Sequence, residues 1–370
     1  MKVLITGSEG FIGYHLYNSI KYKFKDLTLL NFKKEYFEDD SIIDKLIDNA
    51  DVLIHLSGVN RSDDEKFLYD QNLLLTTKLI ESINRVNFSG KLIFASSTQE
   101  DIDTAYGNAK KDSRILFLDE SNKNNFKFIG LIIPNVFGPF CKPNYNSFIS
   151  TFCYNEILGK TNKIIEDNQV NLIYIDNLIL KIIESIYNEE PNKKIIKPDI
   201  KISVSKVKKI IESFNEEYFY SGIIPSIESQ FNFNLFKTFH SFINLESYYP
   251  KKLKLRVDER GSFSEVLRAN IKGQYSYSIT NEDHTRGNHF HTRKIERFIV
   301  ISGKAKIELR KIGSDKRISF ELSGNNPEYI DMPVWSTHNI SNVGKTPLIT
   351  LFWTNEFYND DNSDTFYEKV

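Results

Sequence analysis

Cysteine is scarce in this sequence, and its scarcity excludes a fold that is held together by a framework of disulfide bonds. The 370 residues include two cysteines, Cys141 and Cys153, whereas small secreted domains that depend on disulfides carry many more. Two thiols suit a reducing compartment. The chain also passes from Met1 directly into a strand-like segment, with no room for a signal peptide. The sequence therefore predicts a cytoplasmic location.

Long apolar runs and an excess of one sign of charge are also absent. No apolar run reaches the roughly 18–20 residues that a membrane-spanning helix needs. The net charge is −1, so we expect neither nucleic acid nor an anionic membrane as a partner. Hydrophobic residues make up 40% of the chain, which is enough to build buried cores. The length exceeds that of one typical domain and predicts two.

The N-terminal part alternates short apolar segments with segments of helical periodicity. The apolar segments are nearly continuous, as in parallel strands that are covered on both faces. This alternation predicts a doubly wound, Rossmann-like α/β sheet. The expected strands are residues 2–6, 26–30, 51–57, 91–97 and 126–134, and the expected helices are residues 11–24, 41–49, 67–86 and 106–120.

The pattern changes near residue 244. Before it, residues 136–243 are mixed and helix-rich, and one helix that follows a cap at Asp176 is expected there. After it, short β-rich runs are interrupted by turns and no long helical period occurs, which is typical of an all-β sandwich or barrel. We therefore expect an α/β domain over residues 1–243 and a β domain over residues 244–370.

Glycines follow the first expected strand in the segment TGSEGFIG. Gly7, Gly10 and Gly13 form G-x-x-G-x-x-G between a strand and a helix, as in dinucleotide-binding turns. In such turns the glycines permit a tight turn, a close approach of the pyrophosphate to the helix N-terminus, and close packing of helix on strand. A plain structural turn is the alternative. The residues expected to contact a cofactor here are Gly7, Gly10, Phe11, Ile12 and Gly13.

The second expected strand ends without the carboxylate that would bind the ribose 2′-hydroxyl of NAD. Asn31 stands there, followed by Lys33 and Lys34. Nearby cations favour the 2′-phosphate of NADP, although solvated surface lysines are the alternative. The sequence thus predicts NADPH as the cofactor, with Asn31, Lys33 and Ser57 among its contacts.

The segment YGNAK places Tyr106 and Lys110 four residues apart, on one face of a helix. Lys110 can hold the cofactor ribose and lower the pKa of Tyr106, which would make Tyr106 a proton donor or acceptor. Ser97 ends the preceding strand, at the edge where active sites of open sheets gather. A chance Y-x-x-x-K on a surface helix is the alternative.

Together these motifs resemble the extended short-chain dehydrogenase/reductase family, which acts largely on nucleotide sugars. The resemblance implies that Tyr106 is the acid/base, that Lys110 is its partner, and that Ser97 hydrogen-bonds the substrate carbonyl. The spacing from Ser97 to Tyr106 is shorter than the family usually shows, so Thr98 is an alternative. The segment STQE lacks the aspartate of the family's sugar dehydratases, which leaves reduction or epimerisation. Further segments that resemble the family are residues 55–61, 134–139 and 173–178.

The C-terminal part carries a cluster of potential metal ligands. His289 and His291 alternate on an expected strand and so point to one face. Glu296 and His338 add a carboxylate and a third imidazole, a ligand set that suits Zn²⁺ or another divalent metal. Buried structural histidines are the alternative.

The register of these residues resembles the cupin superfamily, although Trp335 replaces a usual glycine of its second motif. The resemblance implies a double-stranded β-helix barrel that binds metal. Segments 258–263 and 286–289 also resemble cupin epimerases of deoxysugar synthesis. In those enzymes the histidine of R-G-x-H is the base, but here His289 belongs to both patterns. The base stays open between His284, Lys294 and a metal-bound water, and a cupin kept only for dimerisation is a further alternative.

Nearly the whole chain resembles the CapF-type bifunctional enzymes of capsular polysaccharide synthesis, through segments such as HLSGVNR and CKPNYNSFISTFCY. The resemblance implies a homodimer that uses NADPH and Zn²⁺ and acts on a UDP-2-acetamido-2,6-dideoxy-hexos-4-ulose. The cupin would invert C3 beside the ketone, and the α/β domain would reduce C4. The implied product is UDP-2-acetamido-2,6-dideoxy-L-talose, on the route to UDP-N-acetyl-L-fucosamine. The expected substrate contacts are Asn135, Asn144 and Tyr145.

Two other functions stay open. One is a redox-neutral 4-epimerase that holds NAD tightly beside a structural cupin. The other is a sugar-nucleotide sensor or assembly scaffold with an inactive site, against which the presence of Tyr106 and Lys110 argues.

Overall fold

The computed structural model describes residues 1–227, 229–259, 261–270 and 273–370, which form two compact units. The first unit comprises Met1–Phe152 and Lys163–Val207, and the second comprises Cys153–Asn162 and Lys208–Val370. Residues 208–243 thus group with the β-rich part, so the compact units differ from the expected domains, whose boundary near residue 243 stays a prediction. Within the described residues, no helix combines the length and the apolar character needed to cross a membrane.

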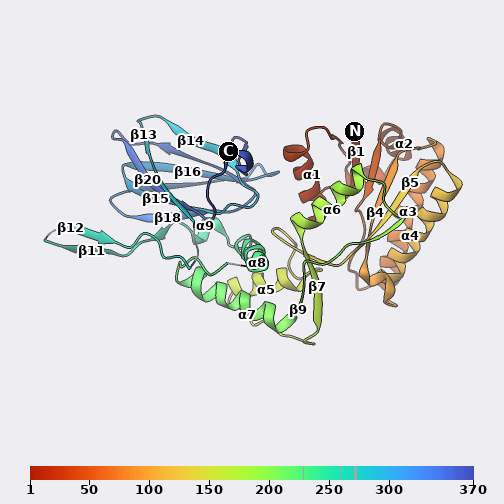
Figure 1. The fold of residues 1–370 in the computed structure, drawn as a ribbon, viewed down its shortest axis with the longest axis horizontal. Coiled ribbons are helices and arrows are strands. Elements are labelled where there is room, and N and C mark those ends of the chain that lie inside the picture. Colours follow the sequence, from red (N-terminus) through yellow and green to blue (C-terminus); the bar gives the residue numbers. More distant parts are fainter. Residues whose placement is uncertain (228, 260, 271–272) are drawn as a thin grey trace. The chain divides into compact units, whose positions relative to one another are not determined.

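A six-stranded sheet forms the centre of the first unit (Figure 1). Its order is β2-β1-β3-β4-β5-β8 and every pairing is parallel, which confirms the expected doubly wound α/β fold. The edge strand β8 was not expected, because its sequence KKI is short and mostly polar. The strands are β1 (Lys2–Thr6), β2 (Thr28–Leu30), β3 (Val52–His55), β4 (Lys91–Ser97), β5 (Lys127–Ile133) and β8 (Lys193–Ile195).

The helices expected from periodicity all form, and several begin at a side chain that caps the free backbone N–H groups. Asp64 caps α3 and Thr104 caps α4 through hydrogen bonds to backbone N–H groups. Asp176 was expected to precede its helix, but α6 begins at Ile175 and places Asp176 in the first turn, where the helix dipole favours a carboxylate. The helices are α1 (Phe11–Lys23), α2 (Asp40–Asp48), α3 (Glu65–Arg85), α4 (Ala105–Lys123) and α6 (Ile175–Tyr187), with short turns η1 (Lys34–Glu38) and η2 (Thr98–Asp101).

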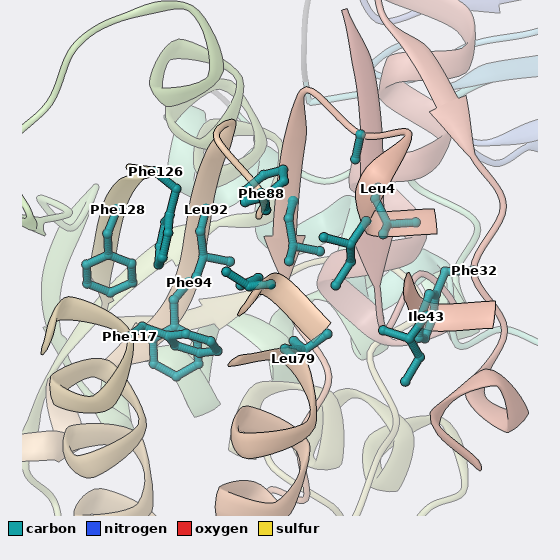
Figure 2. Close-up of a cluster of buried hydrophobic side chains, with 14 of the residues drawn as sticks. Leu4, Phe32, Ile43, Leu79, Phe88, Leu92, Phe94, Phe117, Phe126 and Phe128 are labelled. Atoms are coloured by element: carbon teal, nitrogen blue, oxygen red, sulfur yellow. The ribbon is translucent and has the colours of Figure 1, made fainter. Parts of the chain in front are cut away.

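Helices α2, α3 and α4 bury their apolar faces in one hydrophobic cluster with the sheet (Figure 2). Ile43, Leu79 and Phe117 from these helices meet Leu4 and Leu92 from the strands, and all five side chains are fully buried. Interdigitated cores of this kind are close-packed, so the removal of a large side chain leaves a cavity.

The remaining helices and a small sheet complete the two units. The three-stranded sheet consists of β6 (Asn135–Phe137), β7 (Gln169–Tyr174) and β9 (Ile200–Ser203). The further helical elements are α5 (Phe148–Ile157), α7 (Val204–Phe214), the π-helix η3 (Asn215–Tyr220), α8 (Gln230–His240) and α9 (Leu245–Tyr248).

Two five-stranded antiparallel sheets form the β part of the second unit, which confirms the expected cupin architecture. Their orders are β10-β18-β15-β20-β13 and β17-β16-β19-β14-β21, with β11 and β12 as a separate hairpin. The strands are β10 (Lys251–Lys252), β11 (Leu255–Asp258), β12 (Gly261–Ser264), β13 (Gln274–Thr280), β14 (Thr285–Phe290), β15 (Glu296–Ser302), β16 (Lys304–Lys311), β17 (Arg317–Ser323), β18 (Glu328–Met332), β19 (Ser336–Asn342), β20 (Leu348–Thr354) and β21 (Phe366–Tyr367), with the turn η4 (Asp360–Asn362).

A buried ion pair joins the helical segment of the second unit to its barrel. Arg297 on β15 donates two hydrogen bonds to Asp331 on β18, at 2.7 and 2.8 Å. Tyr218 of η3 donates to the same carboxylate at 2.5 Å, and Arg297 also donates to the Gly222 carbonyl at 2.9 Å. A fragment that starts at residue 244 would keep the Arg297–Asp331 pair but lose its hydrogen bonds with Tyr218 and Gly222, which help to satisfy the buried charges.

We expect Phe117→Ala to lower the free energy of unfolding of the first unit by about 3–5 kcal/mol, because it empties a fully buried site. The matched control is Phe67→Ala on α3, whose side chain is 49% exposed and whose loss should cost only about 0.5 kcal/mol. Urea unfolding followed by circular dichroism measures both. Equal losses would show that the cluster is not closely packed around Phe117.

Candidate functional site

Two positions, one in the turn after β1 and one at the start of α1, fit only a residue without a side chain. Gly7 has φ +76°, and a Cβ at Gly7 would lie 2.8 Å from the backbone nitrogen of Ser57. A Cβ at Gly13 would lie 2.0 Å from the Gly7 carbonyl oxygen. Both positions therefore need glycine, as the motif predicts.

The N-terminus of α1 is open to an anion. Gly10 precedes the helix and no side chain caps it, so the first backbone N–H groups, at Phe11, Ile12 and Gly13, have no helical acceptor. These N–H groups and the helix dipole favour a phosphate at this end. The cradle thus fits the pyrophosphate of a dinucleotide.

The turn lies at the switch point of the sheet, where open α/β folds bind ligands. The chain passes from β1 to β2 on one side and then to β3 on the other. Ser57 follows β3, and its backbone N–H contacts the Thr6 hydroxyl at 3.4 Å. Asn31 and Lys33 follow β2 and are both exposed, so their contact with a cofactor stays a prediction.

Helix α4 brings Tyr106 and Lys110 together, as the sequence predicts. Lys110 is buried, and its ammonium donates to the Ala95 carbonyl at 3.0 Å and lies 5.8 Å from the centre of the Tyr106 ring. Burial lowers the pKa of Lys110 to about 8. Ser97 ends β4, and its hydroxyl accepts a hydrogen bond from the Gln99 N–H at 3.2 Å.

The expected lowering of the Tyr106 pKa is wrong for the chain by itself. Burial raises the pKa of Tyr106 to about 12, and the nearby Tyr145 hydroxyl adds to the rise. Tyr106 therefore holds its proton at neutral pH. The physical reason is that burial desolvates the phenolate and so disfavours the charged form.

Tyr145, an expected substrate contact, lies near enough to Tyr106, the expected catalytic residue, to raise the pKa of Tyr106. The Tyr145 carbonyl accepts a hydrogen bond from Arg61 at 3.2 Å. Asn144, with φ 54°, donates its N–H to Thr151 at 3.0 Å. Arg61 belongs to the segment HLSGVNR. The sequence alone did not single it out as a site residue, and its hydrogen bond to Tyr145 is what places it beside the expected substrate contacts.

Asn135, the remaining expected substrate contact, begins β6 and is exposed. Its position places it after the C-terminal end of β5, at the edge of the sheet where the other expected residues lie. Its contact with substrate stays a prediction.

In the second unit, the four predicted metal ligands come together. His289 lies on β14, Glu296 begins β15, His338 lies on β19 and His291 follows β14. One potential ligand atom from each lies within 4.8 Å of the others. The Glu296 Oε2 atom lies 3.3 Å from His291 Nε2 and 3.2 Å from His338 Nε2.

Three of these ligand atoms are buried without a hydrogen-bond partner, namely His291 Nε2, His338 Nε2 and Glu296 Oε2. A buried polar atom without a partner is costly, and a divalent cation would satisfy all three. The other nitrogen of each ring faces a backbone carbonyl. His291 Nδ1 lies 2.6 Å from the carbonyl oxygen of Asp364, and His338 Nδ1 lies 3.2 Å from the carbonyl oxygen of Ser336. Carbonyls accept from Nδ1–H and leave Nε2 to bind metal, so the residues fit the ion.

The pKa values of His289 and Glu296 suit metal binding at neutral pH. Burial, with His338 and His291 nearby, lowers the pKa of His289 to about 4. Burial would raise the pKa of Glu296, but the imidazoles of His291 and His338 close to its carboxylate outweigh burial and hold this pKa well below its usual range. Burial would lower the pKa of His291, but Glu296 and Asp364 outweigh burial and raise it, so a metal ion competes with a proton at His291. A neutral imidazole and an ionised carboxylate are the forms that bind a cation.

The structure gives no support to either residue predicted as a base. Lys294 is buried, and its ammonium donates to the Ser363 carbonyl. His284 is exposed, with Nδ1 2.8 Å from the Glu282 carbonyl oxygen. Among the described residues, neither side chain forms a hydrogen bond with the four predicted metal ligands, so the role of each stays a prediction. Arg260 of the 258–263 motif lies outside the described residues.

A Rossmann-like unit with a dinucleotide turn and a Tyr–Lys pair, in one chain with a cupin barrel, defines the class of a short-chain dehydrogenase/reductase fused to a cupin. Residues 3–194, more than half of the chain, match the NAD dependent epimerase/dehydratase family, and residues 256–366 match the polysaccharide biosynthesis C-terminal domain. The chain therefore belongs to the NAD dependent epimerase/dehydratase family.

Similarity to known proteins extends over the whole chain. It is 29% identical over 373 residues to the UDP-2-acetamido-2,6-beta-L-arabino-hexul-4-ose reductase of Pseudomonas aeruginosa, covering 99% of this chain and 98% of that protein. The crystal structure of the capsular polysaccharide assembling protein CapF from Staphylococcus aureus is 28% identical, with a TM-score of 0.63 and full coverage of both chains. A CapF structure with the inhibitor 3-isopropenyl-tropolone is 26% identical, with a TM-score of 0.59 and full coverage of both chains. The similarity to CapF-type enzymes expected from the sequence is confirmed.

We expect His338→Ala to abolish tight zinc binding, because it removes one of the four convergent ligands. His284→Ala, which removes an exposed imidazole, is the matched control and should keep about one zinc ion per chain. Elemental analysis of both dialysed proteins, with circular dichroism as a check on folding, makes the comparison. Equal zinc contents would contradict the assignment of the site.

Proposed function

We propose that this chain is a bifunctional nucleotide-sugar enzyme. In this proposal the cupin barrel epimerises C3 of a UDP-2-acetamido-2,6-dideoxy-4-keto-hexose, and the first unit reduces the C4 ketone with NADPH. The single observation that carries it is the presence, in one chain, of a protonated Tyr106 beside Lys110 and of a buried His–Glu cluster with unsatisfied ligand atoms. The names of the full-length relatives, a hexul-4-ose reductase and a capsular polysaccharide assembling protein, support the substrate class.

The reduction uses the glycine turn and the Tyr–Lys pair. NADPH, when bound at the turn, supplies the hydride. Tyr106 donates its proton to the oxygen of the C4 carbonyl, which its high pKa permits because the proton is still present at neutral pH. The Lys110 ammonium then stabilises the phenolate, and the Ser97 hydroxyl orients the carbonyl oxygen.

The epimerisation uses the acidity of the C3 proton beside the C4 ketone. A base removes the proton from one face and a proton returns to the opposite face, with negative charge on the carbonyl oxygen in between. His289, His291, Glu296 and His338 would hold a divalent cation, which supplies Lewis-acid stabilisation of that charge when bound. The candidate bases are Lys294, His284 and a metal-bound water.

The order of the two steps follows from their chemistry. Epimerisation needs the ketone to acidify C3, whereas reduction removes it. The product is then UDP-2-acetamido-2,6-dideoxy-L-talose, a precursor of UDP-N-acetyl-L-fucosamine for capsule or O-antigen polysaccharide. The proposal includes a cytoplasmic homodimer, with Asn135, Asn144 and Tyr145 in contact with the UDP-sugar.

A second candidate is a redox-neutral 4-epimerase that retains NAD. The family description, NAD dependent epimerase/dehydratase, favours it, and the same Tyr106 and Lys110 would serve. In this case purified protein would carry bound NAD, and turnover would consume no NADPH.

We expect Tyr106→Phe to slow NADPH oxidation by about 10²–10⁴-fold, because it removes the proton donor but leaves the ring. The matched control is Tyr187→Phe, whose hydroxyl lies on the surface of α6 and bonds Asp26. The measurement is the loss of absorbance at 340 nm with the 4-keto UDP-sugar. Wild-type protein that oxidises no NADPH, or a Tyr106→Phe variant at the control's rate, contradicts the reductase assignment.

We expect the full chain in D₂O, without NADPH, to incorporate deuterium at C3 of the 4-keto UDP-sugar, because proton removal there needs no hydride. Exchange should persist in Tyr106→Phe and be lost in His338→Ala. Mass spectrometry of the recovered sugar nucleotide reads out each case. Wild-type protein that gives no exchange would refute the epimerase half while leaving the reductase half standing.

A further inference from the structure

We infer that Asp364 is a positioning residue for the metal ligand His291, through a clamp that its carboxylate makes on the turn that follows His291. The inference rests on the metal site of the proposed function. It assigns a role to a residue near the C-terminus, more than seventy positions from His291.

The Asp364 side chain is buried and surrounded by donors from one short turn. Its Oδ1 atom accepts from the Thr292 hydroxyl at 2.6 Å. Its Oδ2 atom accepts from the backbone N–H groups of Thr292 at 3.1 Å, Arg293 at 2.8 Å and Lys294 at 3.1 Å. One carboxylate thus satisfies the donors of three consecutive residues immediately after His291.

The backbone of the same residue holds the imidazole. The Asp364 carbonyl oxygen lies 2.6 Å from His291 Nδ1. A proton on Nδ1, donated to this carbonyl, leaves the lone pair of Nε2 free for the metal and directs it toward Glu296, 3.3 Å away. The carboxylate and the carbonyl belong to one residue, so the side-chain clamp fixes the position of the carbonyl that orients His291.

The conformation of Asp364 shows why the clamp is needed. Its φ is 48°, in the left-handed region that non-glycine residues rarely adopt, although aspartate tolerates it better than most. Buried hydrogen bonds must hold such a conformation. Without the carboxylate, we expect this residue to relax and to move its carbonyl away from His291.

The rest of the C-terminal segment has its own anchors, so the effect of Asp364 is local. Strand β21 pairs with β14 beside His289, and the Glu368 N–H donates to the Asn288 carbonyl at 3.0 Å. The Glu368 carboxylate also accepts from Arg310 at 3.0 Å. These contacts do not involve Asp364 and should keep the segment on the barrel when its carboxylate is changed.

The test is the zinc affinity of full-length Asp364→Asn, measured by competition with a chromophoric chelator. We expect a Kd about 10–100-fold weaker than that of wild type, as is typical when a partner that orients a ligand is lost. The matched control is Asp361→Asn, an exposed carboxylate in η4, which should bind zinc as wild type does. The visible spectrum of Co²⁺-substituted protein should shift in Asp364→Asn, because the geometry of the site changes, and stay unchanged in the control.

Thr292→Ala, which deletes the donor 2.6 Å from Oδ1, keeps the inference testable if Asp364→Asn does not fold. It should weaken zinc binding in the same direction but less. Wild-type zinc affinity and an unshifted Co²⁺ spectrum in the folded Asp364 variant, or in Thr292→Ala where only that variant folds, would overturn the inference alone. A wild-type chain that binds no metal would instead overturn the cupin half of the proposed function.

Discussion

The second unit depends on one constraint: the negative charge of a carboxylate buried in a β barrel must be balanced by nearby positive or polar groups. Glu296 lies among His289, His291 and His338, and burial by itself would keep it protonated. The surrounding imidazoles reverse that preference. They do not satisfy every atom, since three ligand atoms remain without hydrogen bonds. The site is therefore complementary to a cation, and the fold of the barrel supplies the energy to assemble it.

In the first unit, burial likewise shifts the pKa values of two ionisable side chains. Its parallel strands bring the turn after β1, Ser57 and Ser97 to one edge of the sheet. Helix α4 adds Tyr106 with a raised pKa and Lys110 with a lowered one. The shared cause is desolvation, which disfavours both the phenolate and the ammonium. A keto group bound there would meet a tyrosine that still carries its proton and a lysine that is poised to stabilise the phenolate.

Backbone strain in the barrel is concentrated beside the ligands. Trp335 has φ +60° where the cupin resemblance expects glycine. Its N–H donates to the His291 carbonyl at 2.7 Å, its carbonyl accepts from Ile312 at 2.9 Å, and its ring stacks on Phe290. A left-handed tryptophan costs about 1–2 kcal/mol, which complete burial of the indole offsets. Trp335 and Asp364 thus both hydrogen-bond the backbone at His291 and in the three residues that follow it.

Local patterns in the sequence were enough to predict most strands and helices, the dinucleotide-binding turn and the cluster of potential metal ligands. Near-continuous apolar runs predicted five of the six strands of the parallel sheet, and the glycine spacing predicted positions where a Cβ would clash. The spacing of the histidines predicted the residues that converge in the barrel. These features depend on neighbours in sequence, so they can be read without a fold.

Tertiary structure alone decided the properties that depend on distant neighbours. The polar strand β8 forms only because β5 offers it an edge, and residues 208–243 join the barrel through Tyr218 and Asp331. The direction of the Tyr106 pKa shift follows from burial, which no spacing encodes. Asp364 carries no motif, and its contact with His291 exists only because the end of the chain folds back onto the barrel.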